Sequence, residues 1–481
     1  MPLPDRAPRA LPPRSAAPDP AGLTYPAAVE ALAERGRFGI RLGLGRTRAL
    51  LEELGRPQAG IRGALVAGTN GKGSVQALVS AMLASAGLRV GQAPKPHLVE
   101  YRERIVVGGE PIAPDDMAAL VSRVLSASDR LPHRLGPATE FELVTAAAFA
   151  WFAERDVDLA VVEVGLGGRL DATNAWDGGV AAVTNVTMDH AEILGATIPL
   201  IAREKAAILK RGDRAVTGAT GDALAVVRRR ARSLEVPLTE TAPLAVLGMD
   251  RDGLAVEAPG IGSVRLGLLG RHQAANAAVA LGIVDALEEG GIASVPPTAR
   301  REGLERARWP GRLELVQVPV SSDAASVDVL LDGAHNPDGI RALLSALGEL
   351  RPCLAGGPVT VLLGIMGDKD VDTMLQLLAS SAVLDGARVL TVRVGGRGIG
   401  AAELAARFDA SRRSLAPPPG GAGGPRSRTM APVEAASADP AEAFDTALVI
   451  AEREGGPVVV AGSLYLVGAV RGALLARGLV R

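Results

Sequence analysis

The chain of 481 residues is predicted to have an α/β fold, arranged as successive domains that are each built on a mainly parallel sheet. Two observations predict this class. Short apolar runs alternate with helical patterns in both halves of the sequence. A glycine-rich loop at residues 66–75 joins one such run to a helix, and polar residues directly follow several of the other runs. At roughly 150 residues per domain, the length fits two or three domains.

Composition narrows the class of protein before any motif is considered. Apolar residues make up 48% of the chain but aromatic residues only 2%, so Ala, Val and Leu must fill the core. A net charge of −1 argues against nucleic acid as a partner. The single cysteine, Cys353, cannot form an internal disulfide, and no apolar run approaches the ~18 residues of a membrane span. We therefore expect a cytoplasmic protein with no membrane partner.

The first residues are expected to form a disordered leader over 1–22. This stretch is rich in Pro, Arg and Ala and lacks an apolar signal core. A transit peptide is the alternative, but Asp5, Asp19 and the prolines fit it badly. Helices are expected at residues 25–35 and 47–54, before the glycine-rich loop.

The glycine-rich loop follows a predicted strand at residues 61–66 and precedes a predicted helix at 75–86. Such a unit directs backbone N–H groups and a helix N-terminus at one point, which favours a phosphate. The common phosphate-loop pattern has Gly six residues before the lysine and a hydroxyl directly after it. Here Val66 and Gly73 stand at those positions, and Ser74 supplies the hydroxyl one residue later.

Lysine is rare in this chain, which makes the lysine of the loop informative. The lysines are Lys72, Lys95, Lys205, Lys210 and Lys369, whereas arginine is used elsewhere. A glycine-rich turn with a stray lysine is the alternative. We favour a phosphate site in which glycines shape the turn, Lys72 neutralises phosphate charge and Ser74 binds magnesium.

Beyond the loop, residues 94–105 form a dense polar segment that is expected to run into a strand, although a solvated edge strand would look the same. Helices are expected at 114–127 and 140–154. Residues 157–164 then read as a strand buried in a parallel sheet, with Glu163 near its C-terminal end. A buried carboxylate is costly unless it is paired or bound to a cation, and open α/β sheets bind ligands at this end of their strands. A functional role for Glu163 is therefore favoured over a buried ion pair.

A second glycine loop covers residues 165–174, and a strand at 180–186 leads into Asp189 and His190. The helix predicted at 201–209 carries Lys205 on its apolar side, four residues after Ile201. A lysine at such a position either extends to the rim or is chemically modified and held inward.

The remaining chain continues the alternation and contains a predicted domain boundary. A strand is expected at 215–218, short strands at 244–269, and a helix opening at 269 and ending near 288. Domains are expected at 23–298 and 309–481, with a linker at 299–308. The second domain has predicted strands at 327–331, 359–363, 387–394 and 457–461 and a helix at 338–350. Residues 411–440 include a Pro/Gly-rich stretch that is expected to be a flexible insertion.

Seven motifs in order resemble the folylpolyglutamate synthase/dihydrofolate synthase family of Mur-type ATP-dependent amide ligases. They lie at residues 68–74, 163–174, 189–190, 203–206, 272–276, 310–312 and 332–337, and residues 462–466 also match. The resemblance implies an N-terminal P-loop-type ATPase domain and a smaller C-terminal Rossmann-like α/β domain. In this family the loop reads G-T-N-G-K-G-S, which accounts for the displaced hydroxyl of Ser74.

The resemblance also implies a reaction and a set of site residues. ATP would phosphorylate a folate or dihydropteroate carboxylate, and the α-amine of L-glutamate would attack the acyl phosphate. The implied catalytic residues are Lys72, Lys205, Asp332 and His335. The implied nucleotide contacts are Gly68, Thr69, Asn70, Gly71, Lys72, Gly73, Ser74, Asn276, Arg312 and Asp332. Two Mg²⁺ ions would be held by Ser74, Glu163, His190 and a carbamylated Lys205. The implied substrate-side residues are His97, Arg169, Asp171 and Asp189.

One position departs from the family pattern. Lys95 stands where the family's S-P-H-L motif has serine, ahead of His97, which leaves the pterin side of the site open. The motifs do not distinguish dihydrofolate synthase from folylpolyglutamate synthase or from an enzyme that does both. We expect a monomer.

Two alternatives are disfavoured. A Mur ligase acting on a UDP-muramyl peptide usually has Thr directly after the loop lysine and an additional N-terminal domain, for which roughly 40 residues before the first strand are too few. A non-catalytic nucleotide-binding relative would have lost some of Lys72, Glu163, His190 or Lys205, and all are present.

Overall fold

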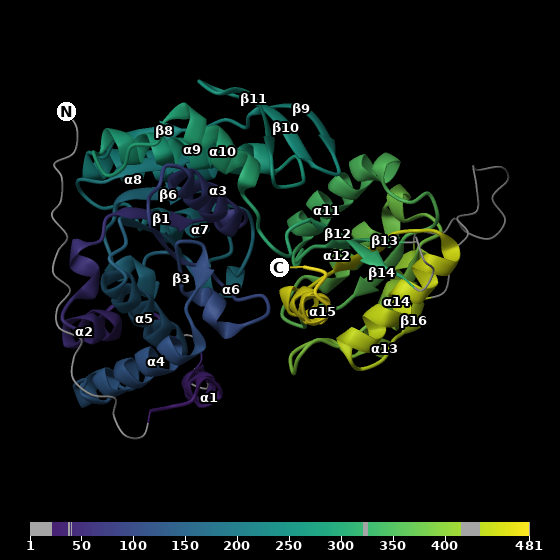
Figure 1. Ribbon diagram of the computed structural model, residues 1–481, viewed down its shortest axis with the longest axis horizontal. Helices are drawn as coiled ribbons and strands as arrows, with labels where there is room; N and C mark the ends of the chain where they lie inside the picture. The colour runs from purple at the N-terminus through teal and green to yellow at the C-terminus, as the bar shows by residue number, and fades with distance from the viewer. Residues whose placement is uncertain (1–21, 37–38, 40, 321–325, 415–432, 481) are drawn as a thin grey trace.

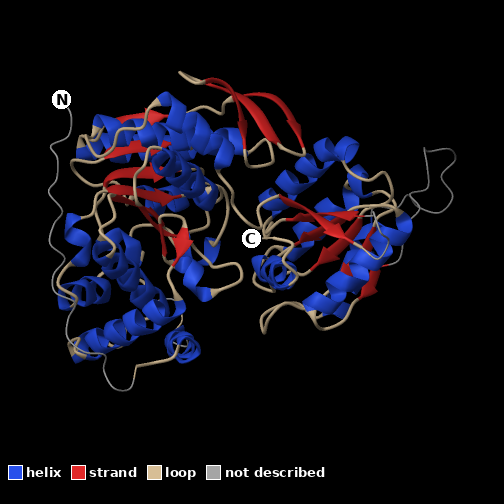
Figure 2. Cartoon of the chain, in the orientation of Figure 1, coloured by secondary structure: helices blue, strands red, loops and turns tan. Residues whose placement is uncertain are grey.

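Two α/β units follow each other along the chain (Figure 1). The computed structural model describes residues 22–36, 39, 41–320, 326–414 and 433–480. The leader expected at 1–22 lies outside this part except for its last residue, as do residues 415–432 of the expected insertion. Helices surround a sheet in each unit (Figure 2), so the predicted α/β class with two sheet domains is confirmed.

The first unit is built on an eight-stranded sheet in the order β4-β3-β2-β5-β1-β6-β7-β8. Its strands are β1 Gly63–Ala67, β2 Val90–Ala93, β3 Val106–Val107, β4 Glu110–Pro111, β5 Leu159–Glu163, β6 Gly179–Val183, β7 Arg214–Thr217 and β8 Leu238–Glu240. The strands from β2 to β8 along this order are parallel, whereas β3 at the other edge pairs antiparallel with both β2 and β4. The glycine-rich loop therefore leaves the centre of the sheet, between β5 and β6.

The sheet is covered on both faces because side chains of a strand point alternately to either side. Leu65 and Ala67 of β1 belong to one core, whereas Ala64 and Val66 belong to the other. The first core is covered by α1 Tyr25–Gly36, α2 Gly45–Glu53, α4 Pro114–Asp129, α5 Glu140–Glu154, α7 Ile198–Ala206 and α8 Gly221–Leu234. The second is covered by α3 Lys72–Ser85, α9 Gln273–Glu289 and α10 Pro297–Arg306.

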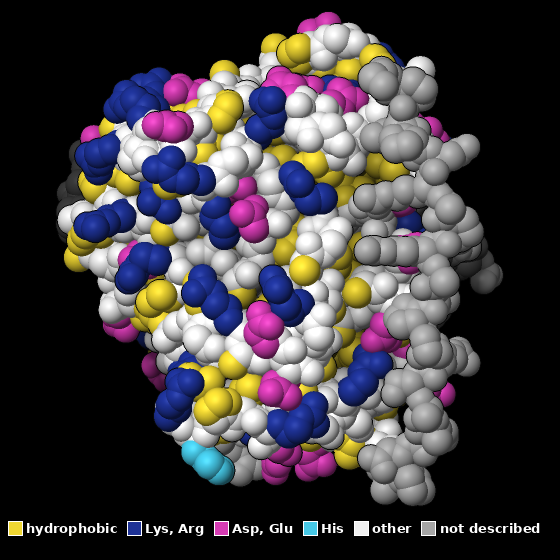
Figure 3. Space-filling view, turned by 90° about the vertical axis from the view of Figure 1, so that its left-hand side faces the viewer, with side chains coloured by type: hydrophobic (Ala, Val, Ile, Leu, Met, Phe, Trp, Pro, Cys, Tyr) yellow, Lys and Arg dark blue, Asp and Glu magenta, His cyan; other side chains and the backbone are white. Residues whose placement is uncertain are grey.

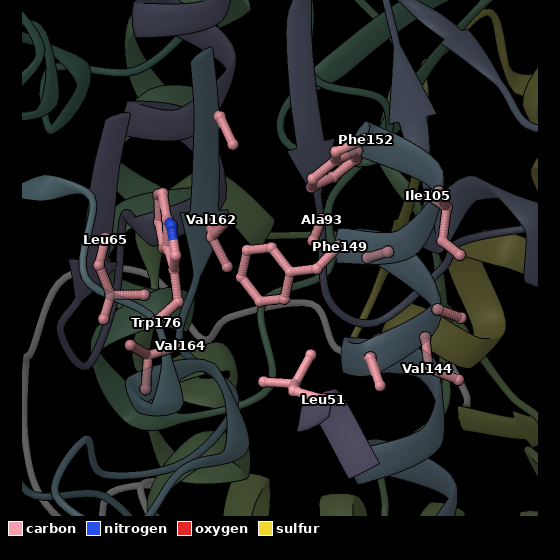
Figure 4. Packing of buried hydrophobic residues seen from close by; sticks show 14 of the residues in the cluster. Leu51, Leu65, Ala93, Ile105, Val144, Phe149, Phe152, Val162, Val164 and Trp176 are labelled. Atoms are coloured by element: carbon pink, nitrogen blue, oxygen red, sulfur yellow. The ribbon is translucent and has the colours of Figure 1, made fainter. Parts of the chain in front are cut away.

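The few aromatic residues are concentrated in the first core. Phe149 lies between Phe152 and Trp176, with ring centroids 6.1 and 5.4 Å away, and faces Val162 of β5 (Figure 4). The indole N–H of Trp176 donates to the carbonyl of Ile61, 3.0 Å away, so this buried polar atom is satisfied. This contact ties the loop after β5 to the start of β1.

A small antiparallel sheet projects from the first unit towards the second (Figure 1). It consists of β9 Ala245–Asp250, β10 Gly253–Ala258 and β11 Gly262–Leu266, as the short strands expected at 244–269 predicted. Residues 299–308 are expected to form a linker, but helix α10 occupies most of this segment. Leu304 of α10 is buried against the core of the first unit.

The second unit has a six-stranded sheet in the order β12-β13-β17-β14-β15-β16, which is parallel except for β12. The strands are β12 Glu314–Pro319, β13 Ser326–Leu331, β14 Thr360–Leu363, β15 Arg388–Thr391, β16 Val433–Ala435 and β17 Val458–Ala461. The helices are α11 Pro337–Leu350, α12 Val371–Ser380, α13 Ala401–Ser414, α14 Pro440–Glu454 and α15 Leu464–Ala476. Apolar cores lie on both faces of this sheet.

Several boundaries differ from the sequence prediction. Helix α3 begins at Lys72 rather than at residue 75, so the loop lysine is its first residue. The segment at 94–105 runs into a strand, β3, as expected, but it first forms a short 3₁₀ helix, η2 Tyr101–Arg104. The helix expected at 201–209 is α7, preceded by the short α6 Ala191–Leu194. The other 3₁₀ turns are η1 Pro57–Gly60, η3 His133–Leu135, η4 Ala172–Ala175, η5 Arg351–Cys353 and η6 Ala382–Leu384.

The surface carries charges of both signs. On the face drawn in Figure 3, Lys and Arg side chains are interspersed with Asp and Glu. This mixture fits the net charge of −1 and offers no continuous basic track on that face. Within the described part of the chain, no helix combines the length and the apolar character needed to cross a membrane.

Candidate active site

A cavity of about 1150 Å³ lies between the two units and is lined by residues of both. Its floor is the glycine-rich loop after β1, and the C-terminal end of β5 and the segment after β6 lie beside it. The second unit contributes the segments that follow β13 and β14. The cavity is thus formed by carboxyl ends of parallel strands from two sheets, which is the position where open α/β sheets bind ligands.

Most of the sequence-predicted site residues line this cavity. They are Gly68, Thr69, Asn70, Gly71, Lys72, Gly73, Ser74, Glu163, Asp171, Asp189, His190, Lys205, Asn276, Arg312, Asp332 and His335. His97 and Arg169 are not among its described lining residues.

The loop requires glycine at Gly71 for two reasons. Its φ of 81° is in the left-handed region, and an added Cβ would lie 2.2 Å from Oδ1 of Asn276. At Gly73 an added Cβ would lie 2.7 Å from the Trp309 ring, which therefore packs directly on the loop. Trp309 was not predicted as a site residue, although it directly precedes the motif that includes Arg312.

Two lysines from distant parts of the chain meet at one carbonyl. Lys72 Nζ donates to the carbonyls of Gly68 (3.2 Å) and Thr69 (3.1 Å). Lys205 Nζ, on α7, donates to the same Gly68 carbonyl at 2.7 Å. Lys205 is only 5% exposed, and burial, reinforced by the neighbouring charge of Lys72, lowers its pKa to about 7. Lys205 therefore lies on the buried side of its helix, as predicted, and its amine is held inside the site.

Glu163 ends β5 with its carboxylate facing the loop lysine. Its Oε1 lies 3.8 Å from Lys72 Nζ, and its Oε2 accepts a long 3.4 Å hydrogen bond from the backbone N–H of Lys95. Burial raises the pKa of Glu163, while the charges of Lys72, Lys95 and Arg312 oppose that rise. A buried carboxylate with only two long contacts has oxygen lone pairs available for a further cation.

The side chains fit a magnesium ion in part. Ser74 and Glu163 offer the oxygen atoms that Mg²⁺ prefers. His190 is at the cavity but its side chain is 41% exposed, with Nε2 3.8 Å from Asp189. No three His, Cys, Asp or Glu residues of the described chain converge as a ready-made metal site. The arrangement therefore suits an ion that retains waters and completes its coordination with phosphate oxygens.

A polar chain connects the loop serine to helix α9. Gln273 Nε2 donates to Ser74 Oγ at 3.4 Å and lies 3.2 Å from Nε2 of His272. Asn276 Nδ2 donates to Gln273 Oε1 at 2.8 Å. The predicted nucleotide residue Asn276 thus also supports the loop, through Gln273, which was part of the same sequence motif.

The second unit brings Arg312, Asp332 and His335 to the cavity. Asp332 accepts the backbone N–H groups of Leu313 (2.8 Å) and Ala334 (2.9 Å), and burial raises its pKa to about 6. His335 Nδ1 lies 2.7 Å from the Gly333 carbonyl. Burial of the ring and the charge of Arg312 lower the pKa of His335 to about 4, so the ring is neutral at pH 7.

Two polar contacts close the cavity across the units, and both involve residues that sequence reasoning missed. Asn336 Nδ2 donates to Asn70 Oδ1 at 3.2 Å. Lys369 Nζ lies 4.0 Å from Asp189 Oδ1. The available signal was that Asn336 and Lys369 each follow a predicted strand of the second domain in a polar segment.

The structure places some of the predicted substrate-side residues at the cavity and others away from it. Asp171 lines the cavity, but its oxygens accept from the backbone N–H groups of Leu166 and Thr173 and from the Thr173 hydroxyl, so it mainly shapes the loop. Arg169 points away and pairs with Glu204 at 2.9 Å. His97 Nδ1 accepts from Arg104 Nε at 2.9 Å, and its ring lies 5.1 Å from that of Tyr101.

Comparison with known proteins places the chain in a class and then in a family. Residues 66–284 match the Mur ligase middle domain, and residues 311–464 match the Mur ligase, glutamate ligase domain. The chain is therefore a Mur-type ligase in its domain composition. It belongs to the folylpolyglutamate synthase/dihydrofolate synthase family, whose members are ligases that form carbon–nitrogen bonds.

Both sequence and structure support this membership. The chain is 37% identical to the dihydrofolate synthase/folylpolyglutamate synthase of Bacillus subtilis over 358 residues, which covers 72% of this chain and 81% of the relative. It is 36% identical to the folylpolyglutamate synthase of Lacticaseibacillus casei, with 70% and 78% covered. The folylpolyglutamate synthase of Mycobacterium tuberculosis complexed with ADP and AMPPCP superposes with a TM-score of 0.77 at 30% identity, covering 93% of this chain and 98% of that one.

Proposed function

We propose that the protein is an ATP-dependent amide ligase that adds L-glutamate to a folate or dihydropteroate carboxylate through an acyl phosphate. The observation that carries the proposal is the meeting of Lys72, Lys205 and Glu163 at the glycine-rich loop, in a cavity shared by two α/β units. Relatives named for this activity, and a solved FPGS–AMPPCP–folate complex that covers 94% of this chain, support it.

The proposed chemistry needs two displacements in one dry cavity. First, a carboxylate oxygen of the acceptor forms a bond to the γ-phosphorus of ATP as the bond to the β-phosphate oxygen breaks, and ADP leaves. Then the neutral α-amine of glutamate attacks the acyl carbon, phosphate leaves and the nitrogen loses a proton. Lys72 lies where it can neutralise charge on the transferring phosphoryl group. The contacts between the units, through Asn336 and Lys369, would exclude water that could hydrolyse the acyl phosphate.

Magnesium would be held by Ser74, Glu163 and His190, and a second ion by Lys205 in its carbamylated form. Bound Mg²⁺ would supply charge neutralisation for the phosphates. The pKa of about 7 favours the neutral Lys205 amine, which is the form that reacts with carbon dioxide, and so supports the carbamate. In this proposal the nucleotide contacts are the loop 68–74 with Asn276, Arg312 and Asp332. We further propose that the enzyme works as a cytoplasmic monomer.

The decisive experiment measures ATP-dependent incorporation of labelled glutamate with three acceptors: dihydropteroate, tetrahydrofolate and a UDP-muramyl peptide. We expect incorporation with one or both pterin acceptors and none with the muramyl peptide. Turnover of the muramyl peptide alone would replace the folate assignment by the Mur one. ATP binding without any glutamate transfer would favour the non-catalytic relative.

The loop lysine provides the internal control for that assay. Lys72→Ala removes the ammonium that faces the transferred phosphoryl group, so glutamate-dependent ADP release should fall at least about 100-fold while the fold persists. Circular dichroism and the thermal midpoint report on folding. Normal ADP release from this variant would refute the central assignment.

A further inference from the structure

The ammonium of Lys95 is enclosed and has no hydrogen-bond partner within the described residues. This residue stands where the family motif has serine, directly after β2. Part of the residue is exposed, but the Nζ atom itself is shut off from solvent and lies 4.0 Å from the centre of the Phe141 ring. Both residues line the cavity.

The surrounding acidic groups are already engaged elsewhere. Asp171 accepts three hydrogen bonds from its own loop. Glu140 accepts from the Tyr101 hydroxyl at 2.6 Å and from Arg104 at 3.2 Å. Glu163 contacts the backbone N–H of Lys95 rather than its ammonium. The Lys95 charge therefore has a cation–π contact with Phe141 and no anion in hydrogen-bonding distance, which is costly for a desolvated ammonium.

The position of Lys95 identifies which anion would satisfy it. One oxygen of Glu163 faces Lys72 and the phosphate loop, and the other faces the Lys95 backbone. Lys95 lines the same cavity as Glu163, Phe141 and Arg104. In the proposed reaction, the acceptor carboxylate that receives the phosphoryl group must approach the nucleotide at the glycine-rich loop, which lines this cavity together with Lys95.

We propose that Lys95 binds the reacting carboxylate of the acceptor and holds it for phosphoryl transfer. On binding, the flexible Lys95 side chain turns from the Phe141 ring into the cavity, and its ammonium donates to one carboxylate oxygen. Arg104 cannot take this role in its present contacts, because it is paired with Glu140 and with His97. This inference rests on the proposed function and adds a specificity-determining residue to it.

The test combines a change in the protein with a matched change in the ligand. Wild type, Lys95→Met, Lys95→Ser and Lys95→Arg are titrated calorimetrically with pteroate and its carboxamide, and with folate and its γ-carboxamide, in the presence of AMPPCP. Methionine keeps the apolar stem over Phe141 without the charge, serine restores the family residue, and arginine retains the charge.

The pairing predicts a specific pattern of affinities. Lys95→Met and Lys95→Ser should weaken binding of the carboxylate ligand by about 10- to 100-fold and leave the carboxamide nearly unchanged. Lys95→Arg should retain part of the preference. In turnover, the KM for the acceptor should rise in the uncharged variants, whereas the KM for glutamate should not.

Other results would overturn the inference. Equal weakening of both ligands would assign Lys95 a merely structural role, and unchanged affinities would show that it does not touch the carboxylate. If wild type transfers glutamate but the carboxylate preference survives in Lys95→Met, the proposed function stands and this inference alone fails. If wild type binds none of the four ligands and transfers no glutamate, both fail together.

Discussion

At the residue scale, the carbonyl of Gly68 is the point where the two lysines of the site meet. Lys72 reaches it from the adjacent turn, while Lys205 reaches it from a helix more than a hundred residues away. Burial lowers the pKa of Lys205, and the repulsion between two ammonium groups at one carbonyl lowers it further. The nearby Lys72 charge, which disfavours a charged Lys205 amine, favours the conversion of that amine into an anion.

The carbamate of Lys205 can be tested without relying on activity. Wild-type protein in ¹³C-bicarbonate should show a carbamate carbon signal by NMR, and Lys205→Ala should not. Lys205→Ala should also lose glutamate ligation, and bicarbonate should not restore it. A mutant with unimpaired ligation would contradict the carbamate, and so would a wild-type spectrum without the signal under turnover conditions.

Sequence reasoning at this scale predicted a residue's position where that position follows from its immediate neighbours. The glycines of the loop, Lys72 and Glu163 lie where their strand-end positions indicated. It was less informative for His97 and Arg169, whose side chains are turned towards Arg104 and Glu204. The sequence pattern around a polar loop residue does not show where its side chain points, because that direction depends on the partner that the side chain contacts.

At the scale of elements, the site depends on how closely helices approach the loop. Helix α3 carries the loop lysine at its first residue, and α10 packs on its far side. An added Cβ at Gly303 of α10 would lie 2.3 Å from Cα and 2.4 Å from N of Met82 in α3. The two backbones are therefore in direct contact, so α10 is packed into the first unit.

This close approach predicts opposite effects for two glycine-to-alanine substitutions. Gly303→Ala should lower the free energy of unfolding by about 1–3 kcal/mol, because the helices must separate. Gly348→Ala is the control: this exposed position in α11 has nothing within 4 Å of an added Cβ. There the higher helix propensity of alanine should stabilise by about 0.5–1 kcal/mol. Chemical denaturation measures both, and a neutral Gly303→Ala would contradict the tight contact.

At the scale of the whole molecule, the small sheet attaches the first unit to the second at a distance from the reacting groups. Arg251, in the turn between β9 and β10, donates to Asp328 of β13 at 2.7 and 3.1 Å and to the Cys353 carbonyl at 2.9 Å. Arg271 adds a contact of 2.8 Å to Glu349 of α11. These contacts and those at Asn70 and Asp189 hold the units on either side of the cavity.

Arg251→Met should weaken the attachment of the units. Asp328 would be left buried without its partner, at a cost of about 1–3 kcal/mol. We expect a lower thermal midpoint, a raised KM for ATP and faster proteolysis between the units. Arg265→Met is the matched control, since it removes an exposed pair with Asp250 and should change stability by less than about 1 kcal/mol. Identical behaviour of the two variants would refute a special role for Arg251.

The sequence by itself determined the two α/β domains, the glycine-rich loop between a strand and a helix, and the strand ends that carry Glu163 and Asp332. These features depend on periodicity and on neighbours within one element, which a linear pattern contains. Only the tertiary structure decided that Lys205 reaches Gly68 and that Asn336 and Lys369 close the cavity. Those contacts join residues far apart in the chain, so they depend on how the sheets, helices and units pack.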